Sequence, residues 1–370
     1  MGMTMILFMI IGLGIYFGAH YLLFFSVARF FEISSPPTKT ILFLIIVFLS
    51  LSFIFSSFLA HYKEGWLTRF FYIFSGFWLG LLVNLLLAIA VVWLIAGLAK
   101  IAGMGINAAP VAAFLFAVAL GFSFYGSWNA FNPRVKNIEV TIKNLPAEWQ
   151  GKTVVQLSDV HLGHIYQAPY LQKLVRQINA LQPEAVFITG DFFDGMDGQL
   201  DSLTQPLNEL QAEKGIYFVT GNHETYLGVD KAFAVLKNTK VKILQNEVAD
   251  VSGLKIIGIN YPSQGEANNE VKILESLKDQ FFGSPNILLF HSPVNIEQVK
   301  NAGVDFQLAG HTHKGQLFPF GFITSLVYKG YDYGLHQNGD FSIYTTTGAG
   351  TWGPPMRTGN IPEIVQIRLK

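Results

Sequence analysis

Five short apolar runs after residue 150 each end in side chains that can bind a metal ion. The side chains are aspartate, asparagine and histidine, whose oxygen and nitrogen atoms ligate divalent metals. Because the carboxyl ends of strands in an α/β sheet form its ligand crevice, we expect these side chains to meet there. In chain order they are Asp159, His161, Asp191, Asn222, His291, His311 and His313.

The spacing of these residues supports one shared site. Where the chain is extended, residues two apart point to the same side. The first and last residues of segment 159–161 can therefore point into the same cavity, and so can those of segment 311–313. Glycine stands directly before Asp191, Asn222 and His311. It allows a sharp exit from a strand and a close approach of the backbone to a ligand. Each segment alone is a weak signal, whereas all five in this order are a strong one.

The donor atoms limit the choice of metal. Carboxylate and amide oxygens with imidazole nitrogens suit Mn²⁺, Fe, Zn²⁺ or Co²⁺ and disfavour Cu(I). The chain contains no cysteine, which excludes disulfides and thiolate catalysis. Seven ligands are more than one ion needs, so we expect two divalent metal ions.

The elements that must position these residues follow the pattern of an α/β or α+β domain. From residue 133 onward, short apolar runs alternate with amphipathic stretches. Residues 136–145 alternate in polarity and 153–157 form a second short strand, so the domain is expected to open with two strands paired across a turn. Helices are expected over residues 171–181, 200–213 and 270–281.

The segments D-x-H, G-D, G-N-H-E, H and G-H-x-H, in this order, resemble the calcineurin-like metallophosphoesterase superfamily. The stretches at residues 289–293, 311–316 and 348–364 are similar to its membrane-anchored bacterial branch. The resemblance covers about residues 137–369. It implies an α/β metallophosphoesterase domain, a two-sheet β sandwich of facing mixed sheets flanked by helices, with the metals at one edge.

The resemblance also implies a role for each ligand. Asp159, His161 and His313 would hold the first ion, Asn222, His291 and His311 the second, and Asp191 would bridge them. Two ions about 3.5–4 Å apart can share a water, lower its pKa and hold the oxygens of a phosphoester, so the nucleophile is a metal hydroxide. His223, beside Asn222, would give a proton to the leaving group as general acid. The residue that orients His223 is not identified.

Four further residues have both a functional and an ordinary interpretation. As substrate-binding residues, His164 would line the mouth of the site, Lys314 would steer phosphate and Arg357 would bind an anionic head group. Their ordinary interpretations are a surface histidine, a solvated lysine and a structural ion pair. Glu224 is interpreted as a support of the ligands or as solvated.

The first third of the chain has a different composition. Of the 25 basic and 25 acidic side chains, seven precede residue 133, and the charged fraction of the whole chain is 14% against about 25% in an average soluble domain. A bilayer core about 30 Å thick needs about 20 apolar residues in a helix. Four stretches meet this and contain no Lys, Arg, Asp or Glu: residues 3–28, 40–60, 70–99 and 106–128. We therefore predict a four-span transmembrane anchor over residues 1–131 and a catalytic domain over residues 132–370.

Two alternatives for these stretches are less well supported. A cleaved signal peptide at residues 1–28 would have a basic start and a shorter apolar core, and three more spans follow it. A transporter would be expected to carry charges within its spans, where His20 is the strongly titratable residue. Basic residues near span ends are more frequent on the cytoplasmic side of a membrane. Here five lie on the side of the two termini and three on the opposite side, which favours a cytoplasmic catalytic domain in a bacterial cell membrane.

The expected function is metal-dependent hydrolysis of a phosphomonoester, phosphodiester or pyrophosphate. The anchor favours a lipid-linked substrate, because tethering raises the effective concentration of compounds at the membrane. A broad phosphodiesterase of soluble substrates tethered to the membrane is the alternative, and a non-catalytic metal-binding sensor is a further one. A net charge of zero gives no electrostatic footprint for nucleic acid, so binding to it is not expected.

Overall fold

The computed structural model describes residues 3–63, 65–195, 200–262 and 269–370. The chain divides into two compact units, which we name the helical unit and the catalytic unit. The helical unit comprises Met1–Trp128 with Gly353–Met356, and the catalytic unit comprises Asn129–Trp352 with Arg357–Lys370. The boundary expected from the sequence differs from this division by three residues and by the Gly353–Met356 segment.

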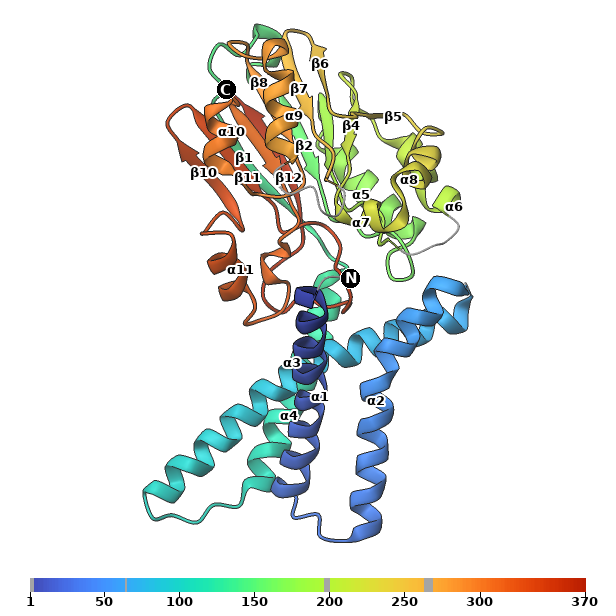
Figure 1. Cartoon of the computed structure of the whole chain (residues 1–370), viewed down its shortest axis with the longest axis vertical. Helices are drawn as coiled ribbons and strands as arrows, with labels where there is room; N and C mark the ends of the chain where they lie inside the picture. The colour runs from blue at the N-terminus through green and yellow to red at the C-terminus, as the bar shows by residue number, and fades with distance from the viewer. Residues whose placement is uncertain (1–2, 64, 196–199, 263–268) are drawn as a thin grey trace. The chain divides into compact units, whose positions relative to one another are not determined.

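Within the described residues, the helical unit contains four helices that are long and apolar enough to cross a membrane. They are α1 (Met3–Phe30), α2 (Pro36–Tyr62), α3 (Trp66–Ile101) and α4 (Ala108–Ala130) (Figure 1). The four apolar helices predicted from the sequence are confirmed. His20 of α1 accepts a hydrogen bond from Trp78 Nε1 at 3.2 Å and donates to the Tyr16 carbonyl at 2.9 Å. Both ring nitrogens of His20 therefore have a partner inside the unit.

The described part of the catalytic unit contains two six-stranded sheets that face each other. Their strand orders are β1-β12-β2-β3-β4-β5 and β10-β11-β9-β8-β7-β6. The strands are β1 (Arg134–Val140), β2 (Thr153–Leu157), β3 (Ala185–Thr189), β4 (Ile216–Val219), β5 (Val241–Ile243), β6 (Glu247–Val251), β7 (Leu254–Gly258), β8 (Asn286–Leu289), β9 (Phe306–Ala309), β10 (Gly334–Asn338), β11 (Phe341–Thr345) and β12 (Glu363–Leu369). One core joins the sheets, with Val154 and Phe187 of the first packed in a cluster with Ile256, Leu289 and Leu308 of the second.

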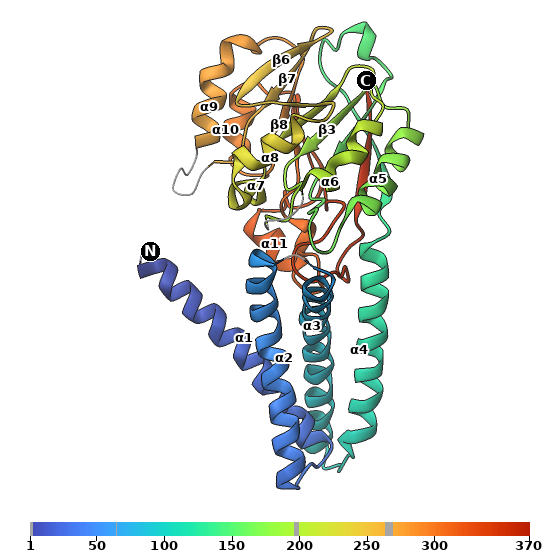
Figure 2. The ribbon, with the colours of Figure 1, turned by 90° about the vertical axis from the view of Figure 1, so that its right-hand side faces the viewer.

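Helices cover the outer faces of both sheets (Figure 2). Helices α5 (Ala168–Ala180) and α6 (Leu200–Thr204) cover the first sheet, and α9 (Asn269–Leu277) and α10 (Ile296–Asn301) cover the second. Helix α5 forms because apolar residues recur on one face, and Leu171, Leu174 and Ile178 of that face are buried. The expected sandwich of mixed sheets with flanking helices is confirmed. The remaining helical segments are α7 (Asn222–Leu227), α8 (Val229–Leu236), α11 (Gly321–Val327) and the 3₁₀ turns η1 (Ala147–Trp149), η2 (Gln205–Glu209), η3 (Lys278–Gln280) and η4 (His313–Gly315).

The expected pairing of the first two strands is wrong. Strand β12 lies between them, parallel to β1 and antiparallel to β2. Polarity alternation identifies a strand but not its partner, and here the C-terminal strand supplies buried residues such as Ile367 to the core.

One expected helix is also shorter than predicted. The stretch over residues 200–213 forms α6 and then the 3₁₀ turn η2, which contains Pro206. Proline has no amide hydrogen and clashes with the preceding turn, so it ends the α-helix.

Candidate metal centre

The seven predicted ligands follow the carboxyl ends of five strands, five of them in loops, Asn222 at the start of α7 and His313 at the start of η4. All five apolar runs are strands, namely β2, β3, β4, β8 and β9. Asp159 and His291 are fully buried, and the other ligands are buried or nearly so. The order of strands β2-β3-β4 in one sheet and β9-β8 in the other brings these loops to one edge of the sandwich.

Five of the seven ligands have left-handed backbone conformations. The φ angles are 52° for Asp159, 52° for His161, 48° for Asp191, 72° for His311 and 46° for His313. Such conformations cost about 1–3 kcal/mol each in a residue other than glycine and cluster at functional sites. The two-residue spacing in the D-x-H and H-x-H segments therefore brings its members together through sharp turns, and not through the extended chain that we expected.

Two glycines allow these turns to approach each other closely. A Cβ atom on Gly221 would lie 2.2 Å from Asp191 Oδ1, and one on Gly310 would lie 2.2 Å from Asp159 Oδ2. No other residue type fits at either position without displacing a ligand carboxylate. The sequence-based explanation of these glycines is therefore supported by the packing.

The first cluster of ligands is Asp159, His161 and His313. The Nε2 atoms of the two histidines are 3.0 Å apart, and His313 Nε2 is 3.4 Å from Asp159 Oδ1. One ligand atom from each of the three residues lies within 4.8 Å of the others. This is a suitable arrangement for a shared cation.

The second cluster is Asp191, His291 and His311. His291 Nε2 lies 3.1 Å from Asp191 Oδ2 and 3.2 Å from His311 Nδ1. His291 Nδ1 donates to the Thr189 carbonyl at 2.7 Å, which directs Nε2 toward the cluster. Asp191 Oδ2 is also 3.9 Å from His161 Nε2, so this carboxylate lies between the two clusters.

Asn222 adds an observation that tests the metal interpretation directly. Its Oδ1 is buried and has no hydrogen-bond partner among the described residues. A buried amide oxygen without a partner is unfavourable, whereas an amide oxygen is a good metal ligand. The donor set and this orphaned atom therefore fit a metal site.

The electrostatics of the clusters agree with this interpretation. Burial lowers the pKa of His161 and His313, and it lowers that of His311 to about 3, so these imidazoles are neutral. Burial opposes charge on Asp191, but His291 and the other nearby histidines hold its pKa well below the ordinary value. The site thus combines a charged Asp191 carboxylate with three neutral imidazoles. Burial disfavours the charged form of His291, but the adjacent Asp191 raises its pKa to about 9, so a metal bound at His291 would displace a proton.

His223 lies at the first turn of α7, next to the ligands. Its Nδ1 donates to the Asp194 carbonyl at 2.8 Å, and its ring is 4.5 Å from the His161 ring. Its amide donates to Asp191 Oδ1 at 2.8 Å. Nε2 is therefore the ring atom left to exchange a proton with a substrate.

Sequence reasoning missed Asp194, which serves as the orienting partner of His223. Its carboxylate Oδ1 also lies 3.5 Å from His161 Nδ1. The contact with His223 uses a backbone carbonyl, so residue type gave no indication of it. A carboxylate three residues after Asp191 was the only available signal.

Glu224 has a supporting position and is not solvated. Its buried carboxylate accepts hydrogen bonds from the amides of Asp191 at 3.0 Å, Phe192 at 2.9 Å, Phe193 at 3.0 Å and Gly221 at 2.6 Å. Burial raises the pKa of Glu224 to about 7. This side chain fastens the loop of Asp191 to the start of α7.

The three candidate substrate-binding residues occupy different environments. Arg357 is fully buried and donates to His313 Nδ1 at 3.0 Å, to Asn360 Oδ1 at 2.7 Å and to the Gly350 carbonyl. Lys314 Nζ lies 4.2 Å from the centre of the Tyr333 ring, and His164 is buried. Their contacts with substrate stay predictions.

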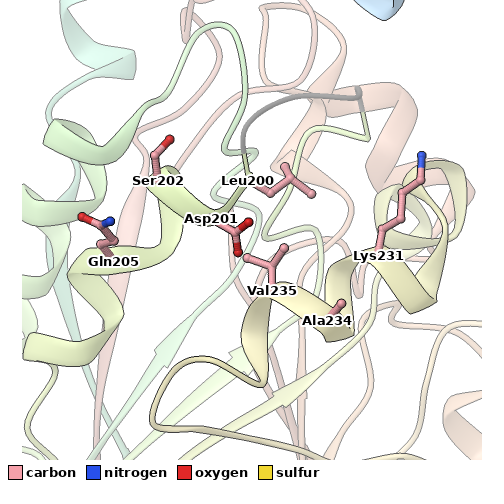
Figure 3. Close-up of a pocket in the computed structure, with 7 residues that line it drawn as sticks. All are labelled: Leu200, Asp201, Ser202, Gln205, Lys231, Ala234 and Val235. Carbon is pink, nitrogen blue, oxygen red and sulfur yellow. The ribbon is translucent and has the colours of Figure 1, made fainter.

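A separate hollow of about 570 Å³ lies beside α6 and α8 (Figure 3). Lys231, Ala234 and Val235 of α8 line one side of it, and Leu200, Asp201, Ser202 and Gln205 line the other. None of the predicted site residues is among these lining residues.

Comparisons with known proteins agree with the geometry. The model of the calcineurin-like phosphoesterase family matches residues 152–315, a stretch that contains all seven ligands and His223. An uncharacterized metallophosphoesterase of Helicobacter pylori is 32% identical over 254 residues, which are 68% of this chain and 68% of that protein. One of Aquifex aeolicus is 30% identical over 263 residues, 68% of this chain and 98% of that protein. A transmembrane protein with a metallophosphoesterase domain from Danio rerio is 32% identical over 266 residues, 66% of this chain and 60% of that protein.

Proposed function

This chain belongs to the calcineurin-like phosphoesterase family of metal-dependent phosphoester hydrolases, and we propose that it uses two divalent ions to cleave a phosphoester or pyrophosphate bond in a lipid-linked substrate. The observation that carries the proposal is the pair of ligand clusters joined by Asp191 Oδ2. The chain is a membrane protein, because it has four apolar helices and is similar to transmembrane relatives.

The ligands divide between the two proposed ions by position. Asp159, His161 and His313 would hold one ion, and Asn222, His291 and His311 the other, with Asp191 shared. When bound, such a pair of ions lowers the pKa of a water and neutralises charge on the phosphoryl oxygens. The orphaned Oδ1 of Asn222 supports its assignment as a ligand.

His223 supplies the remaining chemistry from the protein. The leaving oxygen gains negative charge as its bond to phosphorus breaks, and a proton from His223 Nε2 neutralises it. The Asp194 carbonyl holds the opposite nitrogen and so fixes the direction of Nε2. The centres of the Tyr226 and Trp352 rings lie 5.3 Å and 6.4 Å from that of the His223 ring.

The residues beside His223 also support a substrate with an apolar part. Trp352 is 62% exposed and Tyr226 is 58% exposed, although both rings are close to the proposed proton donor. Exposed aromatic rings next to a polar reaction centre suit a compound with a phosphate group and a hydrocarbon chain.

The test of the reaction is hydrolysis of a chromogenic aryl phosphodiester by the full chain with Mn²⁺. We expect Asp191→Asn and His223→Ala to reduce turnover by about 100-fold or more, since general acid catalysis alone contributes about 10²–10⁴-fold. Asp201→Asn, an exposed carboxylate on α6, is the matched control. Unchanged turnover in both site variants would remove the proposal.

The substrate class needs a separate comparison. The full chain in lipid nanodiscs is given a lipid pyrophosphate, a phospholipid and a soluble nucleotide ester at equal concentrations with Mn²⁺. Preferential cleavage of a lipid compound is expected. Efficient cleavage of the nucleotide ester alone would instead identify a phosphodiesterase of soluble substrates that is tethered to the membrane.

A further inference from the structure

The segment around α11 exposes an apolar surface on the catalytic unit. Phe322 is 74% exposed and Leu326 is 81% exposed, values unusual for neighbouring large apolar side chains. Single exposed apolar residues are common, whereas a contiguous patch indicates a contact surface. We name this the α11 patch, and its members are Phe318, Phe320, Phe322, Ile323, Leu326 and Val327.

The α11 patch does not belong to the core of the catalytic unit. None of the seven residues of α11, all of which the structure describes, is buried. Hydrogen bonds nevertheless hold the helix to the rest of the catalytic unit. Thr324 Oγ1 of α11 donates to Asp332 Oδ2 at 3.2 Å, and Thr312 Oγ1 donates to the Asp332 carbonyl at 2.6 Å. The apolar side chains are therefore presented outward on a fixed support.

A second set of contacts joins the segment that precedes α11 to the end of the last apolar helix. Asn129, at the end of α4, donates to the Arg357 carbonyl at 2.9 Å and to the Asn360 carbonyl at 2.8 Å. Asn360 in turn donates to the Lys314 carbonyl at 3.2 Å, and the Phe318 amide donates to Thr358 Oγ1 at 3.3 Å. All of these contacts lie within the catalytic unit.

This chain of contacts links the segment that precedes α11 to Asn129, near the end of α4. The aromatic residues Phe124, Tyr125 and Trp128 precede Asn129 and are typical of the level of the lipid head groups. Through these hydrogen bonds the α11 patch is joined, within the catalytic unit, to a residue that directly follows this aromatic segment.

The charges around the patch agree with contact to lipid. Residues 317–328 contain no Lys, Arg, Asp or Glu. Lys314 precedes this stretch by three residues, and the exposed Lys329 follows it directly. An apolar surface flanked by lysines is suited to the boundary between acyl chains and anionic head groups.

We propose that the α11 patch lies in the head-group region of the bilayer that holds the four apolar helices, and that its occupant is lipid. The contact fixes the catalytic unit at the bilayer through a second point besides α4. Because Lys314 and Gly315 contact the start of α11, the patch also holds the loop of His311 and His313 close to the lipid surface.

The chain has no cysteine, so single-cysteine labelling can test the proposal without background. The variants Phe322→Cys and Leu326→Cys, each in the full chain reconstituted into phosphatidylcholine–phosphatidylglycerol vesicles, are labelled with an environment-sensitive fluorophore. Ser276→Cys, on the exposed side of α9, is the matched control. Hydrolysis of the aryl phosphodiester, or thermal unfolding if no hydrolysis is found, verifies that each labelled protein is folded.

Lipid contact predicts a blue-shifted emission at positions 322 and 326 and quenching by lipids that carry a spin label near the head group. The label at position 276 should instead be quenched by aqueous iodide alone. Quenching of all three labels by iodide to the same extent would overturn the proposal. Protection of positions 322 and 326 from both quenchers would also overturn it, because protein would then cover the patch.

Discussion

Asp194 contacts two histidines with different expected roles. Its carboxylate lies 3.5 Å from Nδ1 of His161, and its carbonyl accepts from His223. A carboxylate beside the second nitrogen of a metal-bound histidine orients the ring and raises its basicity, and loss of such a partner weakens metal affinity or activity by about 10–100-fold.

We therefore expect Asp194→Ala to require about 10–100-fold more Mn²⁺ for half-maximal hydrolysis of the aryl phosphodiester. The carbonyl that holds His223 remains, so turnover at saturating Mn²⁺ should fall less than in His223→Ala. The measurement is the rate as a function of Mn²⁺ concentration, with Asp201→Ala as the control. A metal dependence equal to that of the unaltered protein would exclude this role.

The individual residues also show what the sequence predicts well. The seven predicted ligands could be named because Asp, Asn and His follow five apolar runs in a definite order, and their binding of metal stays a prediction. Arg357 was identified as a residue of interest, but its contacts were not. His313 is 44 positions away in the chain, and Gly350 is contacted through its backbone carbonyl. Contacts made by backbone atoms, such as the Asp194 carbonyl, leave no mark on residue type.

Strand β12 connects the two ends of the catalytic unit. It lies between β1 and β2, and Ile367 on it is fully buried in the core shared by the two sheets. Removing most of a buried isoleucine side chain costs about 2–5 kcal/mol. Strand β12 should therefore matter for stability although it carries none of the predicted ligands.

We expect Ile367→Ala to lower the free energy of unfolding of the catalytic unit by about 2–5 kcal/mol. The neighbouring side chain of Arg368 is exposed, so Arg368→Ala should change stability by about 0.5 kcal/mol or less. Denaturant unfolding in detergent compares the two variants. Equal effects would show that β12 is not a core strand.

The elements were predictable where local pattern determines them. All five strands that the predicted ligands follow coincide with apolar runs, because a strand buried on both faces is apolar throughout. Every residue of β3, for example, is buried. Strand partners were not predictable, since β1 pairs with residues more than 200 positions later in the chain. The order of strands is a long-range property that alternation of polarity does not encode.

At the scale of the whole molecule, the contrast in composition predicted that the chain has one part made of apolar helices and another that contains the candidate site. Seven charged residues before position 133 and 43 after it separate the apolar helices from the catalytic residues. The return of Gly353–Met356 to the helical unit has no sequence signal, because glycine, proline and methionine are compatible with either unit. The cytoplasmic orientation of the catalytic unit stays a prediction.

Removal of metal should affect the two units differently. The catalytic unit buries Asp159, Asp191 and four histidines at one edge, beside the partly buried His311. A ligand that binds the folded state stabilises it by about 2.7 kcal/mol at a free concentration 100 times its dissociation constant. We expect a chelator to increase hydrogen exchange in residues 190–195, 221–227 and 311–316 and to leave α2 and α3 unchanged. Hydrogen exchange followed by mass spectrometry of the full chain measures both units at once, and added Mn²⁺ should restore the protection. Asp191→Asn is the matched control, since a site without its shared carboxylate should respond little to the chelator. If the chelator changes exchange equally in both units, or in neither, the edge of the sandwich is not where stabilising metal binds.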